Sequence, residues 1–386
     1  MMSNKPPKKK VALVVTSVLM VKFFLVEHIQ ALSEKYELTL ILKNDYPEIL
    51  SATKIQVRVI EIPIERKISI IKDLYVFLIL AVIFYKERFH LVHTLTPKAG
   101  LLGMLAAFLV RAPIRVHTFQ GEVWSTKIGI YRSLLKCMDY LVGCLATTLT
   151  VVSKTEKYFL IKEGVILDKK STVLMNGSIS GVNLDRFKYT HNHREKVRFS
   201  LGISEDQTVF IYVGRINSEK GVVELLLAFQ KLQFISPKSR LLIVGVDEHS
   251  FLEQFLANKP NIRNSINIIP YSQNPEYYMV ASDVIVLPSH REGFGMVIIE
   301  AAAIGIPAIG SNIYGIQDAI VLGETGLFFE KQSISDLLEK MKWMVDNPDE
   351  RVLMGLKARK RVEMSFNQTD VVNAMLDFYA DQFSRL

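Results

Sequence analysis

The fold is decided by one stretch, residues 284–305, which reads VIVLPSHREGFGMVIIEAAAIG. Its four opening residues, VIVL, predict a buried strand, and Pro288 ends it. A polar turn with two glycines then leads into an apolar, alanine-rich helix. Gly305 closes that helix, and Pro307 prevents its continuation. A buried strand followed by a turn and a helix is the repeating unit of a parallel α/β sheet.

The same alternation runs along the rest of the chain. In the first half, strands are predicted at 11–16, 38–42, 57–60, 90–94, 113–118 and 148–152, with helices at 23–35, 70–86, 99–110 and 131–141. In the second half, strands are predicted at 208–213, 240–244, 267–269, 284–287 and 307–310, with helices at 221–231, 275–281, 295–304, 333–346 and 348–365. The predicted fold class is therefore α/β, with two Rossmann-like domains facing each other across a cleft.

The boundary between the two predicted domains is a polar segment. Residues 188–196 (KYTHNHREK) contain no apolar periodicity and are predicted to form a linker. The predicted domains are therefore residues 1–190 and 191–365. Residues 366–386 are predicted to form a C-terminal helix that packs back on the N-terminal domain.

Charge is distributed unevenly between the two predicted domains. Residues 1–190 carry 27 Lys and Arg against 15 Asp and Glu, whereas residues 191–386 carry 20 against 24. A basic surface suits anionic lipid or phosphorylated substrates. Nucleic acid is not an expected partner, because no motif combines aromatic and basic residues in a recognition pattern.

The cysteine content excludes two further classes of protein. Cys137 and Cys144 are the two cysteines, too few for a disulfide framework and consistent with a reducing compartment. No Cys-x-x-Cys pair or His-rich cluster is present, so no metal site is expected.

Two apolar runs, 74–85 and 99–110, bear on membrane contact. Each has 12 residues, and a transmembrane helix needs about 20. We expect buried or half-buried helices that touch a membrane surface without spanning it. The basic start and following apolar run at residues 1–21 lack a small-residue cleavage site, so no signal peptide is predicted.

A candidate anion site lies in residues 213–221, VGRINSEKG. Gly214 follows a strand and lets the backbone approach a ligand closely. Arg215 and Lys220 place two cations in the loop, and a helix starting near Gly221 adds its positive dipole end. A pyrophosphate fits this combination of charges.

A second candidate site follows the strand at 284–287. Glu292 lies in the turn and Glu300 on the helix, with seven residues between them. Gly293 and Gly295 let this turn wrap around a small polar ligand. Carboxylates are acceptors suited to paired sugar hydroxyls, and a buried Glu300 requires such a partner.

The two motifs, together with ETGLFFE at 324–330, resemble the donor-binding half of glycosyltransferase family 4 in the GT-B superfamily. The first half resembles the same family in HTLTPKAGLLGMLAA, RVHTFQGEVW and NGSISGVNLDRF. The whole set is similar to bacterial enzymes that build capsule and O-antigen polysaccharides.

The resemblance implies retaining transfer of a sugar from a nucleotide diphosphate, expected to be UDP, to a lipid-linked saccharide, with no cofactor and no metal. It implies that the N-terminal domain binds the acceptor and the C-terminal domain the donor. Arg215 and Lys220 would neutralise the pyrophosphate, Glu300 would take the ribose hydroxyls and Glu292 the sugar hydroxyls. The backbone of Gly214, Gly293, Phe294 and Gly295 would lie beside the donor. Such an enzyme would be cytoplasmic, on the inner face of the plasma membrane.

One departure concerns a histidine that many family members carry after an N-terminal strand, where it contacts the donor sugar. That position is Gln120 here, so Gln120 supplies the polar contact, or His117 or Glu122 takes it from a shifted loop. Lys98 is a candidate for acceptor phosphate. The first loop, SVLMVK at 17–22, lacks the usual glycine pair, and with Lys22 it is a candidate acceptor contact.

Two other functions fit similar patterns. A nucleotide-sugar epimerase of the same architecture would convert the sugar without an acceptor. A nucleotide-sugar-binding protein without activity would not need the basic pair and the first glutamate, both of which are present.

Overall fold

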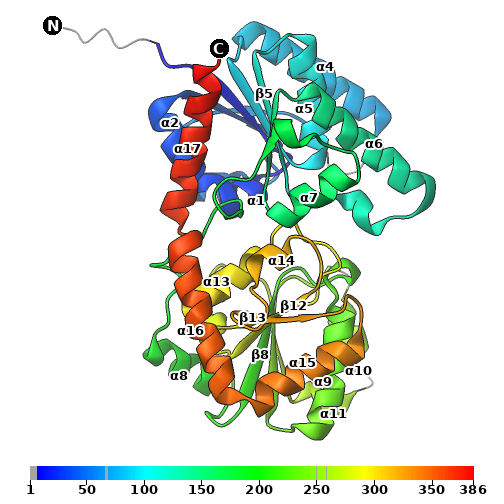
Figure 1. Ribbon diagram of the computed structural model, residues 1–386, viewed down its shortest axis with the longest axis vertical. Helices are drawn as coiled ribbons and strands as arrows, with labels where there is room; N and C mark the ends of the chain where they lie inside the picture. Colours follow the sequence, from blue (N-terminus) through cyan, green and yellow to red (C-terminus); the bar gives the residue numbers. More distant parts are fainter. Residues whose placement is uncertain (1–6, 66–67, 249, 258) are drawn as a thin grey trace, which may run out of the picture. The chain divides into compact units, whose positions relative to one another are not determined.

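A computed structural model describes residues 7–65, 68–248, 250–257 and 259–386. The chain forms two compact units: the first comprises Met1–Ser180 and Thr369–Leu386, and the second comprises Gly181–Gln368. Each unit holds one parallel sheet flanked by helices (Figure 1), which confirms the predicted pair of Rossmann-like α/β units. The chain changes unit after residue 180 and after residue 368, where we expected 190 and 365.

The first unit contains a seven-stranded sheet of order β3-β2-β1-β4-β5-β6-β7. Its strands are β1 (Lys10–Val14), β2 (Glu37–Leu42), β3 (Arg58–Glu61), β4 (Leu91–Leu95), β5 (Ile114–Phe119), β6 (Thr148–Val151) and β7 (Ser171–Thr172). All pairs are parallel, so the carboxyl ends of the strands lie at one edge. The order reverses between β1 and β4, the point at which such sheets bind ligands.

Helices cover both faces of this sheet (Figure 1). They are α1 (Val18–Met20), α2 (Val26–Lys35), α3 (Pro47–Ala52), α4 (Ile70–Glu87), α5 (Pro97–Leu109), α6 (Gly129–Leu145), α7 (Lys154–Lys162) and α17 (Gln368–Ser384). Helices α4 to α7 share one apolar core with the sheet. The helix predicted at 23–35 begins earlier, with α1 and a π-helical turn at Val21–Leu25.

The C-terminal helix α17 packs on the first unit, as predicted. Its Tyr379 hydroxyl is 2.7 Å from His93 Nδ1 in the interior, and Gln382 Oε1 accepts a 2.8 Å hydrogen bond from Thr148. His93 Nε2 lies 2.7 Å from Thr118 Oγ1. Burial lowers the pKa of His93 to about 3, so the ring is neutral and bonds through both nitrogens. This polar chain fixes α17 against two strands.

The second unit contains a six-stranded sheet of order β10-β9-β8-β11-β12-β13. Its strands are β8 (Thr208–Val213), β9 (Ser239–Val244), β10 (Ile266–Ile269), β11 (Val284–Leu287), β12 (Ala308–Ser311) and β13 (Gly326–Phe329). Its helices are α8 (His191–Ser200), α9 (Val222–Ile235), α10 (Phe251–Ala257), α11 (Pro260–Arg263), α12 (Pro275–Val280), α13 (Met296–Ile304), α14 (Ile316–Ala319), α15 (Ile334–Asp346) and α16 (Pro348–Ser365). The order reverses between β8 and β11, the strands that precede the two predicted motifs.

The prediction of a linker at 188–196 is wrong, because α8 occupies most of this segment. Arg198 is buried and reaches both Asp283 Oδ2, at 2.8 Å, and the carbonyl of Ala281, at 3.0 Å. Arg194 also pairs with Asp283, at 2.7 Å. These bonds hold a polar helix that has little apolar surface of its own, which is why its sequence resembles a linker.

The two apolar runs fall in α4 and α5. Among the described residues, no helix has both the length and the apolar character needed to cross a membrane. Helix α5 is largely buried, whereas α4 leaves much of its apolar surface exposed, including Ile70 at 82% and Ile71 at 83%.

Candidate functional site

The first motif forms the loop between β8 and α9. Asn217 caps a short 3₁₀ turn by accepting a hydrogen bond from the backbone N–H of Lys220. Gly221 has a φ of 66°, and a Cβ there would lie 2.0 Å from the carbonyl oxygen of Pro288. This close approach brings the loop after β8 against the loop after β11, so the two motifs form one site.

The second motif is folded just as tightly. Gly295, with a φ of 81°, starts α13. Gly315 packs on the turn from outside, and a Cβ there would lie 2.5 Å from the carbonyl oxygen of Glu292. Phe294 is buried with its ring 5.3 Å from that of Phe366. These contacts hold the backbone of the turn at the N-terminal end of α13, where amide groups favour an anion.

Lys220 and Glu292, 72 positions apart, meet directly. Lys220 Nζ pairs with Glu292 Oε1, and Ser289 Oγ donates a 2.8 Å hydrogen bond to the same oxygen. The side chains remain 22% and 17% exposed, so solvent or a ligand can reach them. An incoming anion would therefore compete with Glu292 for Lys220 and leave the carboxylate available for hydroxyl groups.

Arg215 is held by a residue that sequence reasoning missed. Glu248 Oε1 lies 2.9 Å from Arg215 Nη1, and its other oxygen accepts a 2.7 Å hydrogen bond from Asn217. Tyr212 is also involved, since its buried hydroxyl donates a 2.6 Å hydrogen bond to the carbonyl of Arg215. Burial raises the pKa of Tyr212, so this hydroxyl stays neutral. No pattern around Glu248 identifies it in the sequence.

The two motifs are joined by two further contacts between side chains. His290 Nε2 is 2.9 Å from Glu224 Oε1, and Arg291 is 3.2 Å from Glu219. The backbone N–H of His290 also donates to the carbonyl of Glu219, at 2.9 Å. Arg291 and His290 therefore hold the second motif to the first.

Glu300 projects from α13 without a hydrogen bond or ion pair to any described residue. Burial raises the pKa of its carboxyl to about 7, while the Arg186 guanidinium lowers it and the Glu276 carboxylate raises it. Arg186 is itself held on Glu276, at 2.9 Å. A partly buried carboxyl group with no hydrogen-bond donor among the described residues is suited to a ligand that carries hydroxyl groups.

Known proteins with similar sequences identify the family of this chain. Residues 193–361, which lie in the second unit, match the family described as glycosyl transferases group 1. A capsular polysaccharide biosynthesis glycosyltransferase of Staphylococcus aureus, CapM, is 33% identical over 82% of this chain and 83% of its own length. The chain belongs to the group 1 glycosyl transferases. It is an enzyme that transfers a sugar.

This glycosyl transferase is also similar to a second sugar-transferring enzyme and to solved structures. A UDP-Gal:α-D-GlcNAc-diphosphoundecaprenol α-1,3-galactosyltransferase of Escherichia coli is 29% identical over 90% of both chains. Among solved structures, the fold matches a sucrose-phosphate synthase of Thermosynechococcus elongatus, with a TM-score of 0.79 at 20% identity over 98% of this chain and all of the other. It also matches Anabaena HepE in complex with UDP, with a TM-score of 0.80 at 16% identity over 97% of this chain and all of the other.

In the first unit of the glycosyl transferase, His117 is a packing residue. Its ring is 2% exposed, with Nδ1 2.8 Å from Thr94 Oγ1. A Cβ on Gly100 would lie 2.5 Å from its Cε1 atom, so α5 covers the ring. Burial lowers the pKa of His117 to about 3, which keeps the ring neutral. His117 is therefore closed off from a ligand.

Gln120 directly follows β5 at the carboxyl edge of the sheet. Its Nε2 atom is buried and has no acceptor among the described residues. Thr96 follows the neighbouring strand β4, and its Oγ1 is also buried without a partner. Thr96 has a φ of 89°, a strained conformation of the kind found at functional sites. The geometry thus favours Gln120 over His117, and it adds Thr96.

Glu122 is buried, at 2% exposure, among other carboxyl groups. Its neighbours are Glu156 and Asp139, and the charge of Glu122 raises the pKa of both. The side chain therefore faces a carboxyl cluster in the protein interior, where contact with an acceptor sugar is not available.

The two remaining acceptor candidates lie elsewhere in the first unit. Lys98, on α5, forms a 2.7 Å ion pair with Asp73 of α4, and its side chain is only 11% exposed. Lys22 lies in the π-helical turn, with its Nζ 5.7 Å from the centre of the Phe23 ring. Lys98 therefore ties two helices together, while Lys22 lies in the loop that follows β1.

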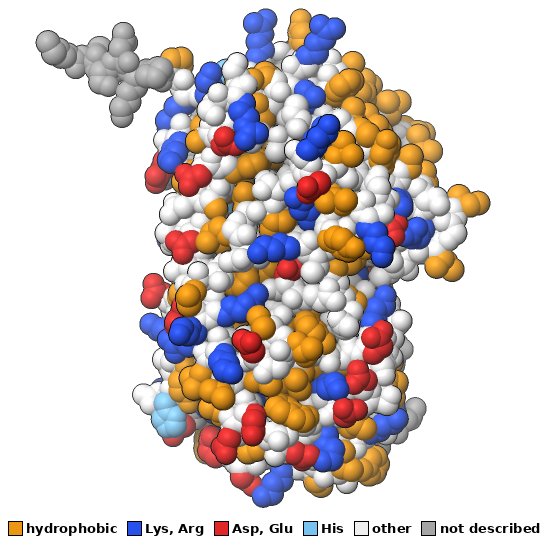
Figure 2. Space-filling view, in the orientation of Figure 1, with side chains coloured by type: hydrophobic (Ala, Val, Ile, Leu, Met, Phe, Trp, Pro, Cys, Tyr) orange, Lys and Arg blue, Asp and Glu red, His pale blue; other side chains and the backbone are white. Residues whose placement is uncertain are grey.

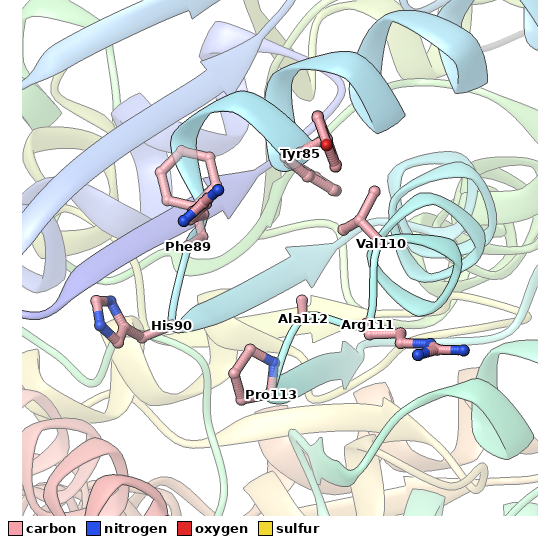
Figure 3. A pocket seen from close by; sticks show the side chains of 9 residues that line it. Tyr85, Phe89, His90, Val110, Arg111, Ala112 and Pro113 are labelled. Atoms are coloured by element: carbon pink, nitrogen blue, oxygen red, sulfur yellow. The ribbon is translucent and has the colours of Figure 1, made fainter.

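A hollow of about 280 Å³ lies at the opposite edge of this sheet, lined by residues that precede β4 and β5. Figure 3 shows His90 and Arg111 at its two ends, with Tyr85 and Val110 along one side. Parallel strands separate it from Gln120, so it is not part of the candidate site. Within the described residues, no three His, Cys, Asp or Glu side chains are placed to hold a metal ion.

Proposed function

We propose that this chain is a retaining, metal-independent family 4 glycosyltransferase that moves a hexose or N-acetylhexosamine from UDP to a lipid-linked saccharide. The observation that carries the proposal is the direct pairing of Lys220 with Glu292 at the carboxyl edge of the second sheet, in the loop that also bears Arg215. Glu300 lies on α13, partly buried and without a hydrogen bond to any described residue.

Each of these groups suits one part of a nucleotide sugar. Arg215 and Lys220 supply cations for the pyrophosphate, and the amides at the start of α13 add further donors. Glu300 accepts hydrogen bonds from the two ribose hydroxyls. Glu292, once Lys220 turns to the phosphates, accepts hydrogen bonds from the sugar.

The same residues support departure of the diphosphate. When the bond between the sugar and the diphosphate breaks, negative charge grows on the leaving phosphate. Two cations and a helix N-terminus stabilise that charge, which is the task a divalent metal performs in other enzymes. Retention requires the acceptor hydroxyl to approach the face from which the diphosphate leaves, and the new bond then has the configuration of the old one.

The acceptor and pathway are proposed from the relatives. CapM is named for capsular polysaccharide biosynthesis, and the galactosyltransferase of Escherichia coli for a diphosphoundecaprenol-linked sugar. We propose a lipid-linked saccharide acceptor of this kind for capsule or O-antigen synthesis. An enzyme with such an acceptor works at the inner face of the plasma membrane.

An apolar surface on the first unit supports membrane contact. Exposed large apolar side chains gather over α4, α5 and α6, where Figure 2 shows hydrophobic side chains in number. They include Ile70, Ile71, Leu74, Tyr75, Leu78, Val82, Tyr85, Phe108, Leu109, Ile128, Ile130, Tyr131, Leu134, Tyr140 and Leu141. Exposed apolar patches of this kind are typical of membrane and protein interfaces. The basic charge of residues 1–190 complements anionic lipid.

We expect the protein to sediment with vesicles that contain anionic lipid, and less so at high salt. The double variant Ile128→Ser and Ile130→Ser should reduce the bound fraction severalfold, because these side chains are 88% and 89% exposed and lose only lipid contact. The matched control is Val352→Ser with Leu356→Ser, at two positions on α16 that are each 59% exposed. Equal binding of both double variants would contradict the assignment of this surface.

The function is tested by supplying nucleotide sugars with a synthetic lipid-linked acceptor in the presence of a chelator. We expect a glycosylated lipid whose anomeric configuration, read by NMR, matches the donor. Thermal shift without acceptor then identifies the nucleotide, since a ligand at 100 times its Kd stabilises by about 2.7 kcal/mol. Sugar conversion without acceptor would favour an epimerase, and an inverted product or loss of activity with the chelator would refute the proposed mechanism.

A further inference from the structure

Three carboxyl groups are buried together at the loop that carries Gln120, one in the loop itself and two on the helices that it contacts. Glu156 of α7 is fully buried, Glu122 is 2% exposed and Asp139 of α6 is 9% exposed. Ionised carboxylates of this kind are costly in an interior unless cations pair with them. The cluster lies at the carboxyl edge of β5 and β6, next to the proposed donor-sugar contact.

The cluster holds the loop by direct hydrogen bonds. The backbone N–H of Gly121 donates to Glu156 Oε1, and Trp124 Nε1 donates a 2.8 Å hydrogen bond to Asp139 Oδ2. Ser125 closes the turn by donating to the carbonyl of Glu122. Residues 120–125 are therefore tied at two points to buried acids.

Glu122 and Glu156 are buried side by side, an arrangement that favours a neutral acid over two ionised ones. The two carboxyl groups are within hydrogen-bonding reach, and ionised carboxylates have only acceptor oxygens. The second oxygen of Glu156 is buried with no donor from any described residue. A proton on one of the two acids would let the pair stay in contact, because the protonated group can donate to the other.

We propose that Glu122, Glu156 and Asp139 form a proton-dependent clasp that positions the Gln120–Ser125 loop for donor-sugar binding. The link to the donor sugar rests on the proposed function, while the clasp itself does not. Glu156 and Asp139 are positioning residues, since they act through the loop.

The groups around the clasp raise the pH at which its acids lose their protons, so we expect the loop to be released at alkaline pH. Burial raises the pKa of Asp139 to about 7 with help from the charge of Glu122, and burial raises that of Glu156 well above its usual range. Arg132 and Lys136 lie over the Trp124 ring, but both are paired with Glu163, at 2.9 Å and 2.6 Å. The N–H groups of Gly121 and Val152 partly offset the effect on Glu156. As pH rises, the acids ionise, repel one another and release the loop.

The clasp can be followed without activity through Trp124. The chain has two tryptophans, and Trp343→Phe leaves Trp124 as the only one. We expect its fluorescence to change as pH rises above about 7, where Asp139 ionises. The double variant Glu156→Gln with Asp139→Asn imitates the protonated acids. Each amide is neutral, keeps an acceptor oxygen and supplies a donor. It should show no such transition, whereas the control Glu34→Gln, at an exposed position of α2, should retain it.

The pH profile of kcat/KM tests the link to the reaction. In the wild type, kcat/KM should fall by about tenfold per pH unit on the alkaline side. The double variant should lose that limb and keep near wild-type activity at neutral pH. A fluorescence transition that persists in the double variant would overturn the clasp whether or not sugar is transferred. Loss of the fluorescence transition with an unchanged alkaline limb would overturn the coupling to donor binding.

Discussion

Replacing Lys220 with alanine should lower kcat by about 10²–10³-fold, because the departing diphosphate loses a positioned cation. The structure gives this lysine a defined place, paired with Glu292 and held by the cap that Asn217 forms. The side chain is 22% exposed, so loss of the ion pair should change the free energy of unfolding by only about 1 kcal/mol. Steady-state kinetics and thermal unfolding on the same preparation check both parts.

A matched control separates this effect from a general loss of charge. Lys231 is exposed and lies on α9, the helix that follows Lys220. Lys231→Ala should leave kcat and donor KM unchanged. If Lys220→Ala kept full activity, the assignment of the anion site between β8 and α9 would fail.

Replacing Glu300 with alanine should lower kcat/KM by about 10²-fold or more. Two hydroxyl groups of the ribose lose a charged acceptor, and hydrogen bonds to charged groups contribute about 1.5–3 kcal/mol each. In the wild type, the donor KM should rise as pH falls through about 7, because Glu300 then becomes protonated. This acid limb should be absent in the variant. The control Glu350→Ala, at an exposed position of α16, should behave as the wild type.

Stability should respond to this substitution in the opposite direction from activity. The pKa of Glu300 rises from 4.5 in the unfolded chain to about 7 in the folded one. Its ionisation therefore opposes folding by about 3 kcal/mol above pH 7, and this cost is absent below about pH 4.5. Relative to wild type, Glu300→Ala should thus gain stability at pH 8 compared with pH 5. An equal difference in unfolding temperature at both pH values would contradict the raised pKa of this carboxyl group.

Much of the fold follows from local pattern. The apolar runs at β8, β11 and α13 are long enough, and their bounding glycines and prolines specific enough, to be recognised one by one. Helix α8 was missed because its stability comes from Arg198 and Arg194 binding Asp283, some 85–89 positions away. A local pattern contains no information on partners so distant in sequence.

The residues of the candidate site likewise differ in whether a local pattern identifies them. Arg215, Lys220, Glu292 and Glu300 were predicted because glycine-rich turns and helix starts identify them locally. Glu248 was not, since it supports Arg215 through a contact across two loops.

The sequence by itself determined that there are two parallel α/β units and that four charged residues follow the strands of the second one. Periodicity and turn chemistry are local, so they can be read without a structure. Only the tertiary structure distinguishes the surroundings of His117 and Gln120, because it shows α5 covering the histidine ring while the amide nitrogen of Gln120 is left without an acceptor among the described residues. It alone also revealed the buried acids beneath that loop. Burial and proximity depend on the packing of distant segments, and they determine which titratable groups lie together in the interior.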